Sequence, residues 1–398
     1  SPYAHAKISS IDTSAAAEAD GVLAVFTHQE VTDSGTVGSI PVGWLLPEIK
    51  TPEHPMLARD TVRYVGDAVA VVVAENRYAA RDAVDLVYVD YDALPASVNP
   101  KTTVEEGAVQ IHKEAPGNIA FDWELGDREA TESAFAHAAN VVEFSSRNNR
   151  LIPFAIEPRC VLAEFDDSNG ELTITMTSQN PHLHRLLMSL ASLGLPEHKI
   201  RVIAPEVGGG FGSKIHHYAD EAITAWCSIQ LNRPVKWTAT RSESSLTDAH
   251  GRDHVSEAAL AVDSEGLITG LRVKTYANMG AYLSTFAPAV PTYLYGTLLS
   301  GEYDIPAIHV ETIGTFTTTA PVDALRGAGR PEATYIVERL MDLAANKIGI
   351  DRPKVSVLSA TEEVLDSVQS SLDAKEITEL ASKEKINADV FGPLAFDN

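Results

Sequence analysis

The chain has 398 residues, of which 44% are hydrophobic and 22% charged, and this allows two or three domains with cores of ordinary size. Its net charge of −24, from 55 acidic and 31 basic residues, disfavours nucleic acids and anionic membranes as partners, because both bind basic surfaces. No apolar run approaches the roughly 20 residues that span a bilayer. The first residues lack the basic and apolar regions of a signal peptide, so we expect a cytoplasmic protein.

The first hundred residues predict short strands and one helix. The apolar run 68–74 is typical of a strand that is buried on both faces. Asn76 is a good cap for a helix that extends to about Val84, and another strand is expected at 86–91. A loop rich in Ala, Pro and Asn follows, so we expect one domain over residues 1–100.

The remaining chain divides into three parts. The polar segment 101–145 predicts a linker with one helical stretch near 130–139, leading into the next domain. From 146 to 350 one pattern is repeated three times: a strand, a loop rich in glycine or amide side chains, and a helix. The segment 351–398 is polar and acidic, and its pattern favours two amphipathic helices. The repeats comprise a strand at 171–176 with a helix after Asn180, a strand at 199–204 with a glycine loop at 208–212 and then a helix to about Leu231, and a loop at 326–330 with a helix to Gly349.

The helix of the first repeat has clear boundary signals. Asn180 is a good N-cap, Pro181 suits the first turn, and Gly194 suits the position just past the end. An apolar stripe at helical spacing is expected to face the core. Its members are Leu183, Leu186, Leu187 and Leu190.

Loops that lead into helices can bind anions. Free backbone N–H groups at a helix N-terminus favour negative charge, and glycine lets a backbone approach a ligand closely. Three such loops in one domain predict a single large anionic cofactor where they meet. Each loop also carries a distinctive side chain, namely Gln179, Phe211 and Arg326.

Two common kinds of cofactor site are disfavoured. The segment Gly208–Lys214 lacks the spacing of a Walker phosphate loop, and Ser213 stands where a dinucleotide fingerprint has its third glycine. Cys160 and Cys227 are too few for an iron–sulfur cluster, which usually takes four cysteines. Both are expected to be buried thiols.

The histidines do not form a recognisable metal motif. Two pairs stand out, but their spacing does not place two imidazoles on one helix face, so we expect solvated or core histidines. The pairs are His182 with His184, and His216 with His217.

The chain carries three motifs in a fixed order, Gln179–His182, Gly208–Lys214 and Ala324–Ala333, and in addition the dipeptide Glu157-Pro158 and the stretch Val62–Pro95. Together they resemble the large subunit of molybdenum hydroxylases, which include xanthine dehydrogenase, aldehyde oxidoreductase and aerobic carbon monoxide dehydrogenase. The resemblance extends to about residue 352. It implies an α+β fold, with an α/β hammerhead domain over 1–100 and the first molybdopterin-binding domain over 146–350.

The resemblance also implies the cofactor and its chemistry. A molybdenum–pterin, expected in its cytosine dinucleotide form, is held by its own dithiolene and not by protein ligands. The reaction is the hydroxylation of a C–H bond with water as oxygen source, and the electrons pass to partner subunits that carry 2Fe–2S clusters and FAD. Gln179 would hydrogen-bond an oxo ligand of the metal, Phe211 would pack against the metal centre, and Arg326 would lie beside it. The pterin would contact the backbone of Gly209, Gly210 and Gly212.

The substrate positions depart from the best-known members. Ile215 stands where purine-oxidising members carry a glutamate, and Ala328 replaces the phenylalanine that stacks on their substrate. Gly327 replaces the cysteine that bridges copper in true carbon monoxide dehydrogenases, so there is no soft ligand for Cu(I). Arg252 weakly matches a substrate-site arginine. We therefore expect an aldehyde or an N-heterocycle as substrate.

The general base of the family is a glutamate near the end of a chain about twice this long, and no match for its motif is present. Glu206 and Glu332 lie beside the right loops, but neither is assigned as the base. A second large-subunit half is therefore an expected partner. Two alternatives stay open: a non-catalytic cofactor-binding or assembly subunit, and an unrelated α/β protein whose loops match by chance.

Overall fold

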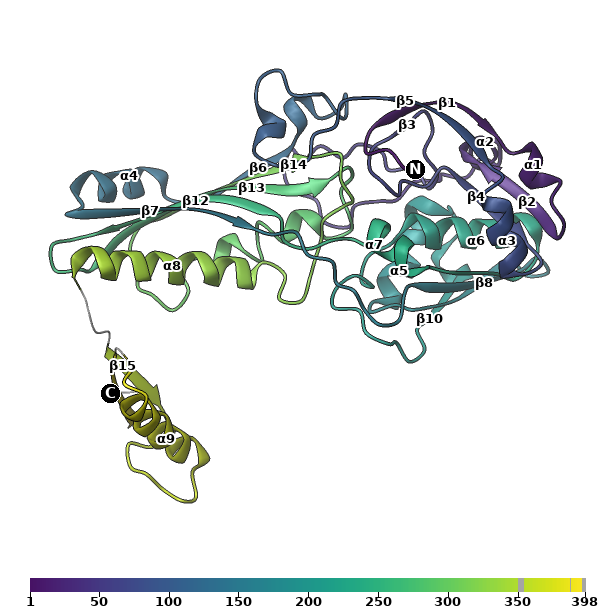
Figure 1. Ribbon diagram of the computed structural model, residues 1–398. Helices are drawn as coiled ribbons and strands as arrows, with labels where there is room; N and C mark the ends of the chain where they lie inside the picture. Colours follow the sequence, from purple (N-terminus) through teal and green to yellow (C-terminus); the bar gives the residue numbers. More distant parts are fainter. Residues whose placement is uncertain (350–353, 387, 396–398) are drawn as a thin grey trace.

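A computed structural model describes residues 1–349, 354–386 and 388–395, in which helices and sheets are segregated as an α+β fold (Figure 1). The N-terminal part contains two small antiparallel sheets, one in the order β3-β1-β5 and the other formed by β2 and β4. Its strands are β1 (Ala6–Asp12), β2 (Val22–Thr27), β3 (Thr61–Val62), β4 (Ala70–Ala74) and β5 (Tyr88–Ala93), and its helices are α1 (Ser14–Ala17), α2 (His28–Asp33) and α3 (Arg77–Val84).

The expected cap of α3 is confirmed, because Asn76 accepts hydrogen bonds from the backbone N–H groups of Tyr78 and Ala79, both at 3.0 Å. The expectation that 68–74 is buried on both faces is wrong. In β4 only Val73 is fully buried, because the strand has a single partner strand and packs on the core with one side.

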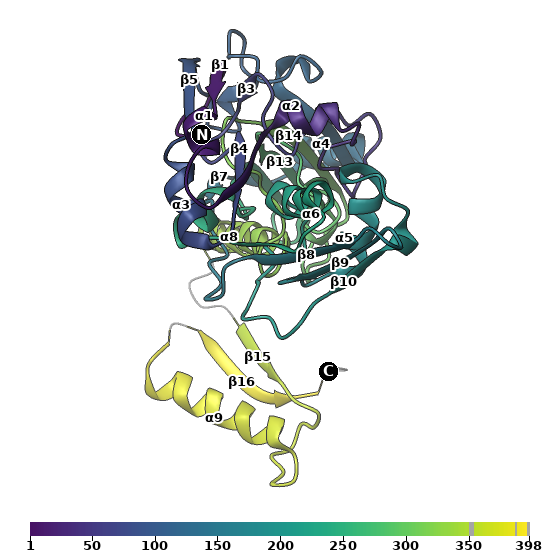
Figure 2. The same ribbon diagram turned by 90° about the vertical axis from the view of Figure 1, so that its right-hand side faces the viewer.

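A four-stranded sheet, in the order β10-β9-β8-β11, forms the second unit. Helix α6 packs against β8, and Figure 2 shows it beside the sheet. The buried side chain of Trp226 lies at 5.0 Å from the ring of Phe26, so the N-terminal part and this sheet share one hydrophobic core. The strands are β8 (Cys160–Asp166), β9 (Glu171–Met176), β10 (Ile200–Ile203) and β11 (Val235–Thr238), and the helices are α5 (Pro181–Leu187) with a π-helical continuation (Met188–Ser192), α6 (Ala219–Leu231) and α7 (Arg241–Thr247).

A five-stranded sheet, in the order β6-β14-β13-β12-β7, forms the third unit. Helices α4 and α8 lie on its two opposite faces (Figure 1), and Ile336 and Leu340 of α8 pack into its core. The elements are β6 (Ile119–Gly126), α4 (Arg128–His137), β7 (Asn140–Asn148), β12 (His254–Val262), β13 (Ile268–Gly280), β14 (Ile308–Phe316) and α8 (Arg330–Ile348). Short 3-10 turns lie at Thr102–Val104, Pro116–Asn118, Glu197–Lys199, Ala287–Ala289 and Gly296–Leu298.

The segment 101–145, expected as a linker, contains β6, α4 and most of β7, the two edge strands of this sheet. The tail also differs from its expectation of two helices. It has one helix, α9 (Gln369–Lys383), packed on a parallel pair of strands, β15 (Lys354–Leu358) and β16 (Asp389–Leu394). Residues 350–353, 387 and 396–398 belong to the predicted tail and to its junction with the preceding domain, and they lie outside the described residues.

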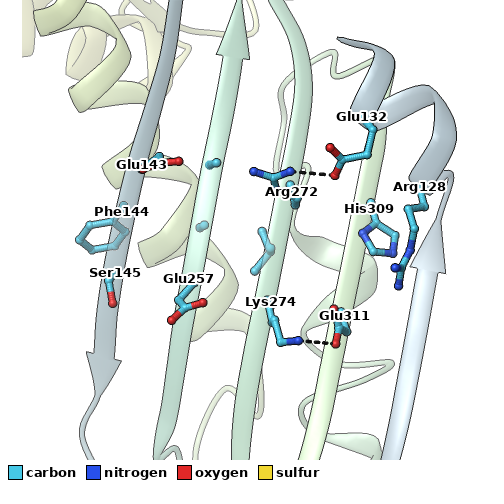
Figure 3. A pocket seen from close by; sticks show the side chains of 13 residues that line it. Arg128, Glu132, Glu143, Phe144, Ser145, Glu257, Arg272, Lys274, His309 and Glu311 are labelled. Atoms are coloured by element: carbon cyan, nitrogen blue, oxygen red, sulfur yellow. Dashed lines mark hydrogen bonds and ion pairs between the residues drawn. The ribbon is translucent and has the colours of Figure 1, made fainter. Parts of the chain in front are cut away.

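A groove of about 510 Å³ crosses the α4 side of the five-stranded sheet (Figure 3). Two ion pairs lie within the groove: Arg272 binds Glu132 at 2.7 Å and Lys274 binds Glu311 at 2.6 Å. The groove shares no lining residue with the three loops described below. None of the helices in the described ranges has the length and apolar character needed to cross a bilayer.

Candidate functional site

The first loop follows the end of β9 and leads directly into α5. Asn180 caps the helix by accepting the N–H of Leu183 at 3.4 Å, and Pro181 occupies the first turn, as the sequence predicts. Of the expected leucine stripe Leu187 is buried, but Leu186 and Leu190 are 38% and 66% exposed. That part of the prediction is wrong, and for Leu190 the reason is that the helix changes to a π-helical turn after Leu187, which shifts the periodicity.

The second loop, Gly208–Gly212, is held by an ion pair. The buried ammonium of Lys214 donates to Oε2 of Glu157 at 2.8 Å, and the N–H of Gly208 donates to the same oxygen at 2.7 Å. Burial opposes ionisation of Glu157, but these bonds outweigh it and lower the pKa of its carboxyl. The expected helix does not begin at this loop. It starts at Ala219, so the N-terminus of α6 does not directly follow the glycines.

Gln179 joins the first two loops. Its Oε1 accepts the backbone N–H groups of Gly212 at 3.1 Å and Lys214 at 3.2 Å. The backbone N–H of Gln179 donates to the backbone carbonyl of Lys214 at 2.8 Å. A Cβ on Gly210 would overlap Oε1 of Gln179, so only glycine allows this approach. Because the oxygen is committed to the loop, the amide N–H₂ is the group of Gln179 that can bind a ligand.

The third loop lies against the second. The N–H of Arg326 donates to the carbonyl of Phe211 at 2.9 Å, and a Cβ on Gly212 would overlap the carbonyl of Ala324. Residues 327–329 have positive φ angles of 100°, 38° and 88° before α8 begins. The structure therefore brings Gln179, Phe211 and Arg326 together, although they are far apart in the sequence.

All three distinctive side chains reach the surface. Gln179 and Arg326 are exposed, and Phe211 is 44% exposed. Within the described residues, neither the guanidinium of Arg326 nor Nε2 of Gln179 has a hydrogen-bonding partner. The loops thus offer a glycine backbone, an amide donor, an aromatic ring and a cation, a set that suits a large anionic ligand with flat rings.

Two of the histidines near these loops, His184 and His217, are buried and hydrogen-bonded within the protein. Nδ1 of His184 is hydrogen-bonded to the hydroxyl of Ser178 at 2.9 Å, and its Nε2 is hydrogen-bonded to the carbonyl of His216 at 2.7 Å. Nε2 of His217 is hydrogen-bonded to the hydroxyl of Ser192 at 2.6 Å. His182 is exposed, so these are solvated or core residues as predicted. Among the described residues no three His, Cys, Asp or Glu side chains are grouped to hold a metal ion. Cys227 is buried as expected, but Cys160 is partly exposed.

Comparison with known proteins identifies the fold. Residues 111–357 match the molybdopterin cofactor-binding domain, and residues 1–95 match the a/b hammerhead domain of aldehyde oxidase and xanthine dehydrogenase. The first of these matches covers more than half of the chain. The chain belongs to the molybdenum hydroxylase family.

Three relatives illustrate this relationship. The carbon monoxide dehydrogenase large chain of Hydrogenophaga pseudoflava is 35% identical over 369 residues, which are 89% of this chain and 45% of that one. The nicotinate dehydrogenase large molybdopterin subunit of Eubacterium barkeri is 30% identical, over 89% of this chain and 80% of that subunit. The crystal structure of quinoline 2-oxidoreductase from Pseudomonas putida 86 has a TM-score of 0.82 and 31% identity, over 88% of this chain and 44% of that one.

The chain thus spans less than half the length of most curated relatives it matches, and most of the length of the nicotinate dehydrogenase subunit.

The residues expected at the substrate side lie around the same loops. Ile215 follows the glycine loop, with its N–H bonded to the carbonyl of Gly212 at 3.1 Å, and it is half-buried. Ala328 is half-buried in the third loop, beside the exposed Gly327. Arg252 is different, because its guanidinium is engaged: it donates to Glu332 at 2.8 Å and to the carbonyl of Arg326 at 2.9 Å.

The two glutamates near the loops lie in different surroundings. Glu206 is exposed, and Glu332 is 1% exposed and paired with Arg252. The ion pair between Glu157 and Lys214 was missed as a functional support. The only signals for it were that Glu157-Pro158 and Lys214 both fall within motifs of the family.

Proposed function

We propose that this chain binds a molybdenum–pterin cofactor and forms part of a hydroxylase that oxidises an aldehyde or N-heterocycle C–H bond with water as oxygen source. The observation that carries the proposal is the geometry of Gln179. Its oxygen is fixed by the N–H groups of Gly212 and Lys214, which leaves its N–H₂ exposed beside Phe211 and Arg326. The cofactor, when bound, supplies the redox chemistry.

Each loop has a separate task in this proposal. The exposed N–H₂ of Gln179 donates to an oxygen of the cofactor, and its direction is set before binding because the opposite end of the amide is already bonded. Gly209, Gly210 and Gly212 let the backbone lie against the pterin, and Phe211 covers it with a ring. The guanidinium of Arg326 holds negative charge of the cofactor or substrate in place.

The substrate class follows from what the loops lack. Ala328 has no ring to stack on a purine, Ile215 cannot hydrogen-bond one, and Gly327 provides no thiolate for copper. Support for an N-heterocycle comes from the relatives named for nicotinate and quinoline. We extend the proposal to the cytosine dinucleotide form of the pterin and to partner subunits with 2Fe–2S clusters and FAD.

The base that activates water is proposed to come from sequence beyond the described residues, either in the same polypeptide or in a second large-subunit half. Among the described residues Glu332 is buried in an ion pair, and Glu206 is exposed and forms no hydrogen bond or ion pair with the loops. This same observation favours the alternative function, a cofactor-binding or assembly subunit without turnover of its own.

The native complex tests both readings. Purification through this chain, followed by metal analysis and fluorescence of the oxidised pterin, should give about one molybdenum and one pterin for each chain. A complex without molybdenum overturns the proposal. A complex that contains molybdenum but oxidises no aldehyde or N-heterocycle, with all its subunits present, supports the non-catalytic alternative.

A further inference from the structure

One guanidinium links the two ends of the third loop. Nη1 of Arg252 donates to Oε2 of Glu332 in the first turn of α8 at 2.8 Å. Nη2 of Arg252 donates to the backbone carbonyl of Arg326, where the loop begins, at 2.9 Å. The side chain of Arg252 is only 10% exposed. The contact with Glu332 is therefore partly buried, whereas the contact with the carbonyl of Arg326 lies at the surface of the loop.

The backbone that carries this arginine is itself unusual. Arg252 and Asp253 are consecutive non-glycine residues with φ angles of 67° and 63°. Such left-handed conformations cost free energy in non-glycine residues, and they are found where contacts with neighbouring residues stabilise them. Here Asp253 accepts hydrogen bonds from Arg150 at 2.8 Å and from the side chain of Asn278 at 2.9 Å.

The preceding residue is fixed as tightly. Gly251 exchanges two backbone hydrogen bonds with Leu151, at 2.8 and 3.0 Å. A Cβ on Gly251 would overlap the side chain of Leu325, so the chain at 251 presses directly against the residue before the third loop. The position from which Arg252 reaches the loop is therefore set by packing and hydrogen bonds outside the loop.

The loop needs such support. Ala328 has a φ of 38° between two glycines of positive φ, and the turn is closed by the N–H groups of Ala328 and Arg330, which donate to Leu325 and Gly327 at 2.6 and 3.2 Å. Glu332 is 2% exposed at its side chain, and Arg252 is its ion-pair partner. A lysine could neutralise Glu332, but it lacks the planar fork of donors that reaches two acceptors at once.

We propose that Arg252 is a positioning residue, which fixes the conformation of loop 326–330 through Glu332 and the carbonyl of Arg326 and thereby directs the side chain of Arg326 toward its ligand. In this role Nη1 and Nη2 of Arg252 each donate a hydrogen bond to an acceptor of the protein, in place of the substrate contact expected from the sequence. The identity of that ligand rests on the proposed function, whereas the effect on the loop does not.

Hydrogen–deuterium exchange on the whole protein tests the proposal without cofactor. The reporters are the amides of Arg326, Ala328 and Arg330, all hydrogen-bonded in the loop. Arg252→Lys keeps the charge beside Glu332, and Arg252→Gln removes it. We expect Arg252→Lys to recover most of the melting temperature lost in Arg252→Gln, yet both variants to exchange the loop amides at least about tenfold faster, with β12 and β13 unchanged.

Ile336→Val is the control, since Ile336 is 3% exposed and belongs to the core cluster that α8 forms with the five-stranded sheet. The proposal is overturned if Arg252→Lys leaves the loop amides protected, or if Ile336→Val exposes them equally. Molybdenum content of the wild-type protein, prepared in the same way, separates the two claims. Faster loop exchange in Arg252→Lys beside a wild-type protein that contains no molybdenum rejects the proposed function alone, whereas protected loop amides in Arg252→Lys beside a molybdenum-loaded wild-type protein reject the positioning role alone.

Discussion

The side-chain oxygen of Gln179 accepts two backbone N–H groups, and Arg326 is linked to the same surface only through its backbone. Both side chains are exposed, so their removal should leave the fold intact. We expect Gln179→Ala and Arg326→Ala each to lower turnover of the assembled enzyme by roughly 10²-fold, as for the loss of a preorganised donor at a reacting centre. Turnover and melting temperature are the measurements, and the exposed His182→Ala is the control. Unchanged turnover in both variants would contradict the assigned roles.

Gly210 tests the glycine loop by sterics. A Cβ there would overlap Oε1 of Gln179, so Gly210→Val should displace Gln179 and hinder cofactor insertion. The measurement is molybdenum per chain, expected to fall at least several-fold. Gly107→Ala is the matched control, because its added methyl group meets nothing within 4 Å although its φ of 85° also disfavours a side chain. Full molybdenum occupancy in Gly210→Val would refute the expectation.

The residues that could be found from sequence are those that stand in loops between a strand and a helix, such as Gln179 and Arg326, where local pattern and motif coincide. Their supports could not be found in this way. Lys214 and Glu157 are 57 positions apart, and Arg252 and Glu332 are 80 apart. A buried lysine or an engaged arginine looks like any surface charge until the fold brings its partner to it.

The contacts of Trp226 indicate how strongly helix α6 stabilises the fold. Trp226 is 2% exposed, its ring contacts Phe26, and its indole N–H donates to Ser34 and Thr36, both at 3.2 Å. Trp226→Ala should therefore lower the free energy of unfolding by about 3–5 kcal/mol. Denaturant unfolding checks this value, with Trp44→Ala, a tryptophan that is 39% exposed, as the control. Equal losses in the two variants would contradict the shared core.

The local pattern predicted β9, α5 and α8 well because each carries its own cap or periodicity. It failed for β6 and β7, which are the edges of the five-stranded sheet. Trp123 of β6 pairs with Thr312 of β14, and these two residues are far apart in the sequence. Such strands are stabilised by partners that are distant in the sequence, so the polar segment 101–145 predicts a linker although it forms edge strands.

Three histidines with lowered pKa values, of which His112 is buried and His54 and His250 are half-buried, make the whole molecule sensitive to acid. Burial lowers the pKa of His54 to about 3, with the nearby His112 adding to the effect, and it lowers the pKa of His112 to about 4 despite a bond to the carbonyl of Ala281. Burial, together with Arg150, lowers the pKa of His250 to about 4. His54 stacks on Tyr282 at 4.1 Å, which places it between the N-terminal part and the segment that follows β13.

The direction follows from proton linkage. These histidines take up protons near pH 6.5 when unfolded but only near pH 3–4 when folded, so the stability present above pH 6.5 is lost as the pH falls from about 6.5 to 4. Asp67 acts in the opposite direction, because burial raises its pKa to about 6 and the folded state gains that proton first. Among the described residues the pKa is lowered for seven histidines and raised for His184 and for the carboxyls of Asp67, Asp122 and Asp248, so the midpoint of urea unfolding should fall between pH 7.5 and pH 5.

Two variants with opposite effects make this prediction specific. His54→Phe keeps an aromatic ring on Tyr282 but cannot be protonated, so it should reduce the slope of stability against pH by up to ~1.4 kcal/mol per pH unit. Asp67→Asn removes the group that binds a proton in the folded state, so it should make the loss on acidification steeper. Urea titrations at several pH values measure both slopes. If the two variants keep the wild-type slope, the acid sensitivity does not originate at this junction between the units.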